Sequence, residues 1–473
     1  MENLNNKTQE ELIEIIKQLK NTKKYGLIWE SEVHKENLLD DIKNNHPILV
    51  NLPKLNISNN SQNSHVFIEG ENLFALHALN SIQKDLIDVI YIDPPFNTGR
   101  DFRYNDQFVD SEDGYKHSKW LNFMSSRLKL AKSLLKETGV ILVHIDNHES
   151  AQLKLLLDDI FGEENFRSSI IWSYRTGGAP SKRDVFAKKH DTIFLYSKNQ
   201  NQFFFNKLKQ KIVYEKKFFG DMPMDQDGNY YAEVNLRDSI EGEIHLMKDG
   251  QPYKELNVKP VINVSSERVE KFPTQKPKGL MKYLFEILLP QNGIVLDFFA
   301  GSGSTMHSVL ELNSENDSNI RSILVTNNED QIAKDTTYPR IKSLLKEFNE
   351  NLTYYKVDFT PGDNADPSIF ELAKNSIDLL CIKENTHDEF FKNDQIKIYK
   401  NLSDHYLIVI LDEESIQKAL EKLDSTSGSY SFYIFSLGGE NYLEELNSFV
   451  ISNPSTKSTS FPLELKNIYN SLK

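Results

Sequence analysis

A run of apolar residues that ends in Asp-Pro-Pro-Phe constrains the fold of this chain more than any other feature. Residues 86–92, with the sequence LIDVIYI, predict a buried β-strand, and the chain then turns at Asp93. Pro94 and Pro95 fix φ and have no backbone N–H, so the strand cannot continue into a helix. We therefore expect the Asp93 carboxylate and the Pro94 carbonyl to lie at the edge of a sheet as two hydrogen-bond acceptors.

Two adjacent acceptors match an amino group with two N–H donors, such as the exocyclic amine of a nucleobase. Phe96 follows within reach to stack on such a base. The alternative is an ordinary strand that ends in a proline turn, with Phe96 in the core. A tetrapeptide alone does not decide between the two interpretations, so the rest of the chain must.

Apolar stretches of strand length alternate with amphipathic helices around this turn, which is typical of a parallel α/β sheet. Upstream, a strand at 65–73 is expected to turn into a helix at 74–79. Downstream, the pattern predicts a helix at 120–136 that Gly139 ends, a strand at 140–146, a helix at 149–161, and strands at 169–172 and 192–196. His144 lies between apolar residues, and we expect it to be a hydrogen-bonded core histidine rather than a catalytic one.

A second strand that ends in an acid, at 293–297, runs through Gly301-Ser302-Gly303 into a helix at 306–312. The N–H groups of such a loop and helix N-terminus face the carboxyl edge of the sheet, where they bind ligands. No lysine follows the glycines, as a P-loop requires, and the spacing is not GxGxxG. Asp297 beside the loop would repel a pyrophosphate but suits an ammonium or sulfonium group.

The next predicted strand, at 322–329, ends in the acid Glu329. In dinucleotide-type sheets, an acid at the end of the second strand typically binds ribose hydroxyls. Glu329 is therefore a candidate for that contact, although a surface acid at a strand end fits the sequence equally well.

Charge is distributed unevenly along a chain whose net charge is −14. Residues 172–218 contain 11 Lys and Arg against 3 Asp and Glu, whereas residues 361–473 contain 10 against 18. The region at about 174–271 is also rich in turns and aromatic residues. This mixture is what an inserted segment for nucleic-acid recognition needs, although a solvated charged surface fits the sequence about equally well. The candidate DNA-binding residues are Arg175, Lys182, Arg183, Lys188 and Lys189.

The remaining features exclude several classes of protein. Cys381 is the one cysteine, which rules out a disulfide framework and a cysteine zinc site and predicts a small buried side chain. We predict no metal site, no membrane span and a cytoplasmic location. Three parts are expected: an N-terminal helical arm at 1–45, a catalytic domain at 46–360, and an acidic α/β domain at 361–473 for protein contacts.

Together, the two strand-end motifs 93–96 and 297–303 resemble those of amino-group DNA methyltransferases that use S-adenosylmethionine. The motif order, with the catalytic motif before the cofactor loop, is similar to their β-class permutation. Further stretches, at 24–30, 68–73, 119–124, 272–277 and 337–341, resemble the modification subunits of type III restriction-modification systems. The resemblance implies a Rossmann-like, doubly wound methyltransferase sheet with an inserted target-recognition region.

The resemblance also implies roles for individual residues. Asp93, Pro94, Pro95 and Phe96 would form the catalytic motif around a flipped adenine, although the family more often has Tyr where this chain has Phe96. Asp93 favours adenine N6, because cytosine-N4 members usually have Ser there. The implied cofactor-binding residues are Glu71, Asn97, Thr274, Gln275, Lys276, Asp297, Phe298, Gly301, Gly303, Ser304 and Glu329.

The implied partners are double-stranded DNA, a second copy of the chain in a homodimer, and a separate ATP-dependent restriction subunit. The sequence itself leaves three functions open. The first is adenine-N6 methylation of DNA, the second is amino methylation of cytosine or RNA, and the third is a DNA-specificity subunit without activity.

Overall fold

The computed structural model describes Thr8, Trp29 and residues 36–59, 61–81, 85–99, 102–104, 107–174, 186–217, 220–261, 275–359, 373–435 and 446–460. Most of the N-terminal helical arm predicted at 1–45 lies outside these residues, and the described part contains the helix α2 (Leu38–Asn44). Four candidate site residues also lie outside the described residues: Thr274, Arg175, Lys182 and Arg183.

A ten-stranded mixed sheet forms the centre of the described part of the chain, with the strand order β1-β16-β2-β15-β14-β3-β6-β8-β7-β11. Its strands are β1 (Pro47–Asn51), β2 (Ser64–Glu69), β3 (Ile87–Ile92), β6 (Leu135–Ile145), β7 (Phe166–Ser173), β8 (His190–Ser197), β11 (Ser239–Ile240), β14 (Ile294–Asp297), β15 (Arg321–Thr326) and β16 (Asn351–Phe359). The strands from β16 to β6 are parallel, whereas β8 is antiparallel to both of its neighbours. The fully buried, β-branched sequence of β3 explains its central place in the sheet.

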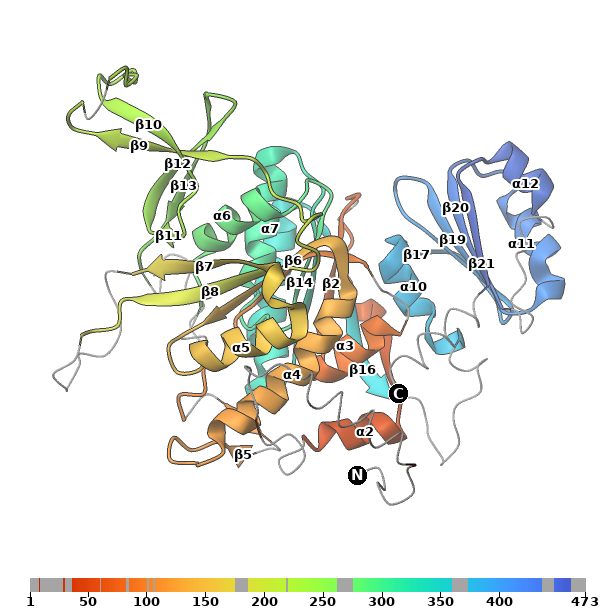
Figure 1. The fold of residues 1–473 in the computed structure, drawn as a ribbon. Helices are drawn as coiled ribbons and strands as arrows, with labels where there is room; N and C mark the ends of the chain where they lie inside the picture. Colours follow the sequence, from red (N-terminus) through yellow and green to blue (C-terminus); the bar gives the residue numbers. More distant parts are fainter. Residues whose placement is uncertain are drawn as a thin grey trace.

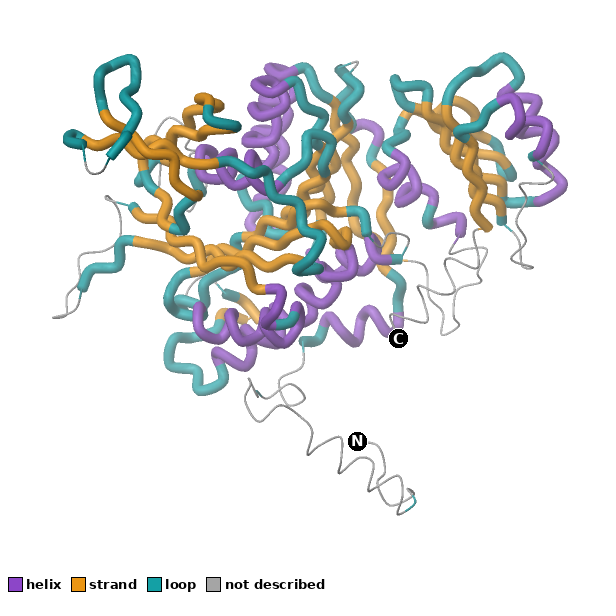
Figure 2. Tube along the Cα trace, turned by 45° about the horizontal axis from the view of Figure 1, so that its top comes forward, coloured by secondary structure: helices purple, strands orange, loops and turns teal. Residues whose placement is uncertain are grey.

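Helices cover both faces of this sheet (Figures 1 and 2). One face packs against α3 (Asn72–Asn80), α4 (Lys116–Leu134) and α5 (Ser150–Phe161), whose buried side chains join the core cluster that contains Ile90 and Ile92. On the other face, α6 (Lys278–Leu288) and α7 (Ser304–Asn316) pack over Val89 and Tyr91, and α8 (Tyr338–Phe348) follows α7. The predicted doubly wound α/β fold is therefore confirmed.

The predicted boundary at Gly139 is wrong. Helix α4 ends at Leu134, and β6 begins at the next residue, so that Gly139 lies inside the strand. A Cβ atom at this position would come within 2.9 Å of the Ile87 carbonyl oxygen. Gly139 is thus required for a close approach between neighbouring strands and does not cap the helix.

A second sheet, with the order β10-β9-β12-β13, is built from part of the basic region. Its strands are β9 (Lys209–Tyr214), β10 (Tyr230–Asn235), β12 (Gly242–Lys248) and β13 (Gln251–Val258). The predicted insertion at 174–271 was drawn too widely, because β8 lies within that range but belongs to the central sheet. Sequence composition marked the basic charge of the region but could not show which strands pair with β6 and β7.

The C-terminal part folds around a five-stranded sheet, ordered β17-β18-β19-β20-β21, which lies beside the central sheet (Figure 1). Its elements are α10 (Ile377–Glu384), β17 (Asp388–Lys392), β18 (Ile396–Lys400), β19 (His405–Ile410), α11 (Ile416–Leu423), β20 (Ser429–Ile434), α12 (Asn447–Ser452) and β21 (Thr456–Ser460). Helix α10 joins the two parts: Leu379 and Leu380 belong to the core cluster that contains Ile90 and Ile92, and Asp378 accepts a hydrogen bond from the Asn51 amide at 3.2 Å. Cys381 is buried in the same cluster, as predicted.

Within the described residues, no helix is both long and apolar enough to cross a membrane.

Candidate functional site

The point where the strand order reverses lies between β14 and β3. Val295 pairs with Val89 in parallel register, and from these two strands the chain proceeds in opposite directions across the sheet. In open α/β sheets, ligands bind at the carboxyl ends of the two strands that flank such a reversal. Asp297 ends β14 and Asp93 follows β3, so the topology brings the two predicted motifs together.

One oxygen of the Asp93 carboxylate is paired and the other is not. Asp93 Oδ2 lies 2.7 Å from Lys276 Nζ, whereas Oδ1 is buried and has no hydrogen-bond partner among the described residues. The turn itself is anchored by Trp120, whose indole Nε1 donates to the Pro95 carbonyl at 2.8 Å. A buried acceptor without a donor is costly, so Oδ1 is a place where a ligand N–H would be favoured.

The Phe96 ring is half-buried beside this carboxylate and contacts two polar groups. Its plane is nearly parallel to the His144 ring, with the centroids 6.2 Å apart, and Lys276 Nζ lies 4.9 Å from its centroid. His144 is fully buried and hydrogen-bonded, as expected from the sequence. Phe96 also packs against the core cluster. The same ring therefore follows the strand-end turn and contacts the core.

Asn97, the residue after Phe96, forms a contact with Glu149 that the sequence did not indicate. It adopts a left-handed conformation with φ of 60°, and its amide donates to Glu149 Oε1 at 2.6 Å. Glu149 also contacts His117 Nδ1 at 2.7 Å, and burial raises the pKa of its carboxyl group. The predicted contact of Asn97 with a cofactor remains a prediction, because this amide group already holds Glu149.

The loop after β14 has the tight backbone that the glycines predicted. Gly301 and Gly303 have φ of 47° and 78°, and a Cβ on Gly303 would lie 3.3 Å from Ile341. Arg340, which sequence reasoning missed, donates to the hydroxyl groups of Ser302 and Ser304 at 3.0 and 3.2 Å. The loop is thus held from α8, and α7 starts at Ser304, so that its N-terminal N–H groups, which have no acceptor within the helix, follow the carboxyl end of β14.

Asp297 is a buried acid at the end of β14. Its carboxylate accepts hydrogen bonds from Thr305 Oγ1 at 2.5 Å and from the Phe299 amide at 3.0 Å. Burial is the main cause that raises its pKa to about 7, and the nearby charge of Asp93 acts in the same direction. A cation bound in the crevice would favour the ionised form of this carboxyl group.

The raised pKa of Asp297 makes the stability of the ligand-free protein depend on pH. The unfolded chain releases this proton near its ordinary pKa of 3.8, whereas the folded chain keeps it until about 7. The protonated Asp297 therefore contributes its full share to the free energy of unfolding below about pH 4. This contribution, on the order of 4 kcal/mol, is lost as the pH rises through 7.

We expect Asp297→Asn to flatten this decline, which urea unfolding at pH 5 and pH 8 would measure. Asp85→Asn is the matched control, because the Asp85 side chain is 57% exposed. Equal declines in wild type and Asp297→Asn would contradict the expectation.

Arg127 of α4 binds the side chains around Glu71. The guanidinium is fully buried and donates to Glu71 at 2.7 Å, to both carboxylate oxygens of Glu36 at 2.9 Å, and to Asn72 at 2.5 Å. Asn72 in turn donates to the Phe298 carbonyl at 3.0 Å, so the Gly-rich loop is tied to the same cluster. Sequence reasoning found Glu71 and Phe298 but missed Arg127.

Glu329 and Gln275 complete the described cofactor candidates. Glu329 begins a short 3-10 turn after β15 and forms an ion pair with Arg103 of the β4–β5 hairpin, in which both side chains are 39% exposed. That hairpin, β4 (Arg103–Tyr104) and β5 (Gln107–Phe108), forms from the long polar loop after Gly99. Gln275 is buried next to Lys276.

Of the five basic residues predicted to bind DNA, the structure describes Lys188 and Lys189. Lys188 is paired internally: its Nζ lies 2.8 Å from Asp191 and 3.4 Å from Asp146. Lys189 is exposed. Both residues precede β8, whose Thr192 pairs with Ile145 at the carboxyl end of β6, on the edge that carries Asp93.

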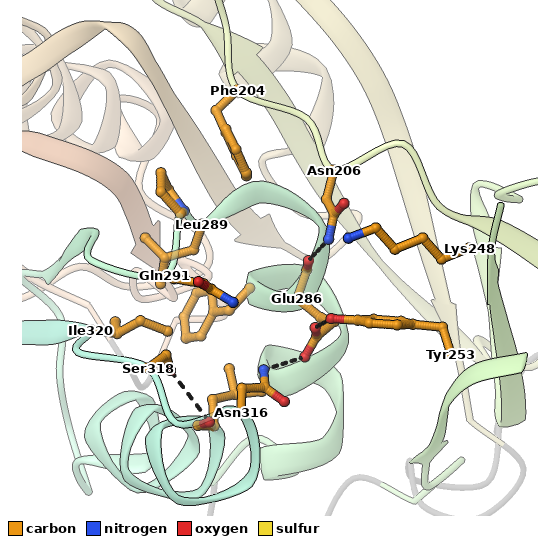
Figure 3. Close-up of a pocket in the computed structure, with 13 residues that line it drawn as sticks. Phe204, Asn206, Lys248, Tyr253, Glu286, Leu289, Gln291, Asn316, Ser318 and Ile320 are labelled. Carbon is orange, nitrogen blue, oxygen red and sulfur yellow. Dashed lines mark hydrogen bonds between the residues drawn. The ribbon is translucent and has the colours of Figure 1, made fainter.

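Two further cavities lie away from this edge. One, of about 440 Å³, lies between β13 and helices α6 and α7, where Glu286 accepts hydrogen bonds from Tyr253 and Asn316 (Figure 3). Glu286 also accepts a hydrogen bond from Lys254. The other, of about 520 Å³, lies in the C-terminal part beside Glu384 and His405, which are 3.0 Å apart. The Glu286 network attaches the second sheet to the catalytic core, and Glu384 ties α10 to β19.

Comparison with known proteins finds one family whose model includes the residues of this edge. The family model described as a DNA methylase matches residues 87–350, which includes both Asp93 and Asp297. The type III restriction-modification enzyme StyLTI Mod subunit of Salmonella typhimurium is 29% identical over 61% of this chain and 57% of its own length. The EcoP15I Mod subunit of Escherichia coli is 25% identical over 67% of each chain.

A shorter match has higher identity. The probable HindVI Mod subunit of Haemophilus influenzae is 43% identical over 31% of this chain and 19% of its own length. Among solved structures, the PvuII cytosine-N4-specific DNA methyltransferase aligns over 61% of this chain and 93% of its own, with 14% identity and a TM-score of 0.36. The chain therefore spans less than two thirds of the length of the StyLTI and HindVI subunits.

Proposed function

We propose, since the chain belongs to the DNA methylase family, that it transfers a methyl group from S-adenosylmethionine to N6 of an adenine in duplex DNA, as the modification part of a restriction-modification system. The observation that carries the proposal is the buried Asp93 Oδ1, which has no hydrogen-bond partner in the described part of the chain and lies at the reversal of the strand order. The similarity to type III Mod subunits supports the assignment to such a system.

The residues of the turn would activate the amino group of a flipped base. The N6 lone pair is delocalised into the adenine ring, which makes it a poor nucleophile. Asp93 Oδ1 and the Pro94 carbonyl would accept its two hydrogens and favour a tetrahedral nitrogen, while Phe96 stacks on the base. The negative charge of Asp93 would also stabilise the positive charge that develops on N6 during transfer.

The residues around the Gly-rich loop fit a cofactor with an amino-acid end and a ribose. When bound, S-adenosylmethionine supplies an electrophilic methyl group on a sulfonium centre. Asp297, with its raised pKa, would face the cationic part, and Gly301 and Gly303 would let the backbone approach closely. Glu71 and Glu329 offer carboxylates for the adenosine end, and each is paired with an arginine.

The other predicted cofactor-binding residues would line the same site. We assign this role to Asn97, Thr274, Gln275, Lys276, Phe298 and Ser304. Lys276 would additionally orient the Asp93 carboxylate, since its ammonium group lies 2.7 Å from Oδ2.

Adenine is the proposed target because Asp93 provides a charged acceptor. The second candidate is cytosine N4, which presents the same pair of amino hydrogens. Incubation of the protein with mixed-sequence duplex DNA and labelled S-adenosylmethionine, followed by nucleoside analysis, distinguishes them. We expect N6-methyladenine. N4-methylcytosine as the product would overturn the choice of base, and no labelled nucleoside at all would overturn the proposed function.

The proposed partners follow from the same assignment. Arg175, Lys182, Arg183 and Lys189 would contact DNA phosphates, and Lys188 would act within the protein instead, because it is already paired with two acids. A restriction subunit that hydrolyses ATP and a second copy of this chain are the proposed protein partners. The acidic C-terminal part is the proposed surface for them, and deletion of residues 361–473 that left both associations intact would overturn that role.

A further inference from the structure

A buried imidazole forms one wall of the Phe96 site. His144 has no exposed surface, and its ring plane deviates by only 16° from that of Phe96. Trp172, which is also fully buried, packs edge-on against the same imidazole with the centroids 5.8 Å apart. Because this interior is closely packed, a change in the position of His144 would be transmitted to Phe96.

Both nitrogens of this imidazole are held. His144 Nε2 lies 3.1 Å from Asp191 Oδ2, and Nδ1 lies 3.3 Å from the hydroxyl group of Tyr91. Burial, with a smaller contribution from the charge of Lys276, lowers the pKa of His144, so the ring is neutral near pH 7. A neutral ring that donates to Asp191 through Nε2 accepts from Tyr91 through Nδ1, which fixes its tautomer and its orientation.

Asp191, which is hydrogen-bonded to His144, is also hydrogen-bonded to Lys188. Lys188 Nζ donates to Asp191 Oδ1 at 2.8 Å, so the two oxygens of one carboxylate bind the lysine and the histidine. Burial acts to raise the pKa of Asp191, but the contacts from His144 and Lys188 outweigh it and hold the pKa well below its ordinary value. Lys188, Asp191, His144 and Phe96 therefore form a continuous line of contacts.

The outer end of this line lies next to the region proposed to bind DNA. Residues 186–189 follow 175–185, which contain Arg175, Lys182 and Arg183, and Phe186 is fully exposed to solvent. The inner end is the ring proposed to stack on the target base. The segment that contains the outer end and the ring at the inner end would thus contact the same DNA molecule, Lys189 at its backbone and Phe96 at the extruded base.

We propose that His144 is a positioning residue that couples the 186–189 segment to Phe96, so that the stacking ring is held in place through Lys188 and Asp191. This inference rests on the proposed function, because it assigns the site a coupling between DNA contact and base stacking. His144 does not touch the base itself. Its effect is exerted through the orientation of Phe96. If the coupling exists, the effects of changing Lys188 and of changing His144 are not additive.

A double-mutant cycle between Lys188→Met and His144→Phe tests the coupling. His144→Phe keeps an aromatic ring but loses both hydrogen bonds, and Lys188→Met keeps a side chain of similar length but loses the ammonium group with its contacts to Asp191 and Asp146. Lys198→Met is the matched control, because Lys198 ends the same strand region but pairs with Asp85 at 2.5 Å, away from His144. The readouts are kcat, KM for DNA, the fluorescence of 2-aminopurine at the target position, and the urea unfolding midpoint.

We expect each single variant at 144 or 188 to lower kcat about 10-fold and to reduce the 2-aminopurine signal, with KM for DNA changed less than 2-fold. The double variant should be no worse than His144→Phe alone, and Lys198→Met should leave kcat unchanged. A rise in KM alone for Lys188→Met would assign this lysine to simple phosphate contact and overturn the proposal. Additive effects on kcat would overturn it as well.

The unfolding midpoints separate failure of this inference from failure of the proposed function. If the wild-type protein methylates no DNA, the proposed function fails, while a non-additive unfolding cycle still supports the physical link between Lys188 and His144. An additive unfolding cycle in a protein that does methylate DNA overturns the coupling and leaves the proposed function standing.

Discussion

Replacement of Asp93 with alanine is expected to lower kcat for methyl transfer by about 10²- to 10³-fold, the effect typical of losing one group that stabilises charge in a transition state. The side chain supplies the one buried carboxylate oxygen at this turn that lacks a partner among the described residues, and its charge faces the nitrogen that becomes positive. Rates measured at saturating S-adenosylmethionine, together with cofactor affinity from calorimetry, would show the loss in kcat with affinity changed little.

Two further variants make this result specific. Asp93→Asn keeps an acceptor but removes the charge and the ion pair with Lys276, so its kcat should lie between those of wild type and Asp93→Ala. Asp85→Ala changes an exposed acid just before the same strand and should leave kcat unaltered. Full activity in Asp93→Ala would contradict the assignment of this turn as the catalytic motif.

Replacement of Arg127 with methionine is expected to cause the largest loss of stability. It would leave the carboxylate of Glu36 buried without its cation, and loss of one partner from a buried ion pair typically costs about 3 to 5 kcal/mol. Because Asn72 and Glu71 lose the same donor, the anchor of the Gly-rich loop at the Phe298 carbonyl would also loosen. Urea unfolding would measure the first effect and calorimetric titration of the cofactor the second.

Arg103→Met is the control for this experiment. Arg103 also pairs with a carboxylate of the proposed cofactor site, Glu329, but both side chains are 39% exposed. Exposed ion pairs contribute roughly 0 to 1 kcal/mol, so the unfolding midpoint of Arg103→Met should barely change. Comparable losses of stability in the two variants would show that the buried cluster around Arg127 does not have the role we assign to it.

Helix α4 shows that the sequence can mark Arg127 as unusual but cannot identify its partners. Trp120, Met124 and Leu128 recur at helical spacing, and Arg127 lies seven residues after Trp120 on the same buried stripe. A charged residue on an apolar stripe predicts a buried partner, and this signal was available. Its partners Glu36 and Glu71 were not, because they are 91 and 56 residues away in the chain and only the packing of α4 brings them together.

The strand pattern led to a different kind of error. The apolar run that contains His144 was assigned correctly, but Gly139 was taken as a helix end because glycine commonly follows helices. In the folded protein this glycine admits the Ile87 carbonyl of the neighbouring strand. Local pattern could not distinguish the two uses, since the distinction depends on how closely another strand approaches.

The sequence by itself determined the α/β class, the two strands that end in Asp93 and Asp297, and the glycines of the loop, because periodicity, proline and glycine act locally. Only the tertiary structure decided that β14 and β3 are neighbours at the reversal of the strand order. It also decided that Asp93 pairs with Lys276, 183 residues away, and that Lys188 reaches Phe96 through Asp191 and His144. These contacts join separate strands and helices, and hydrogen bonds and burial between such elements exist only after the sheet has formed.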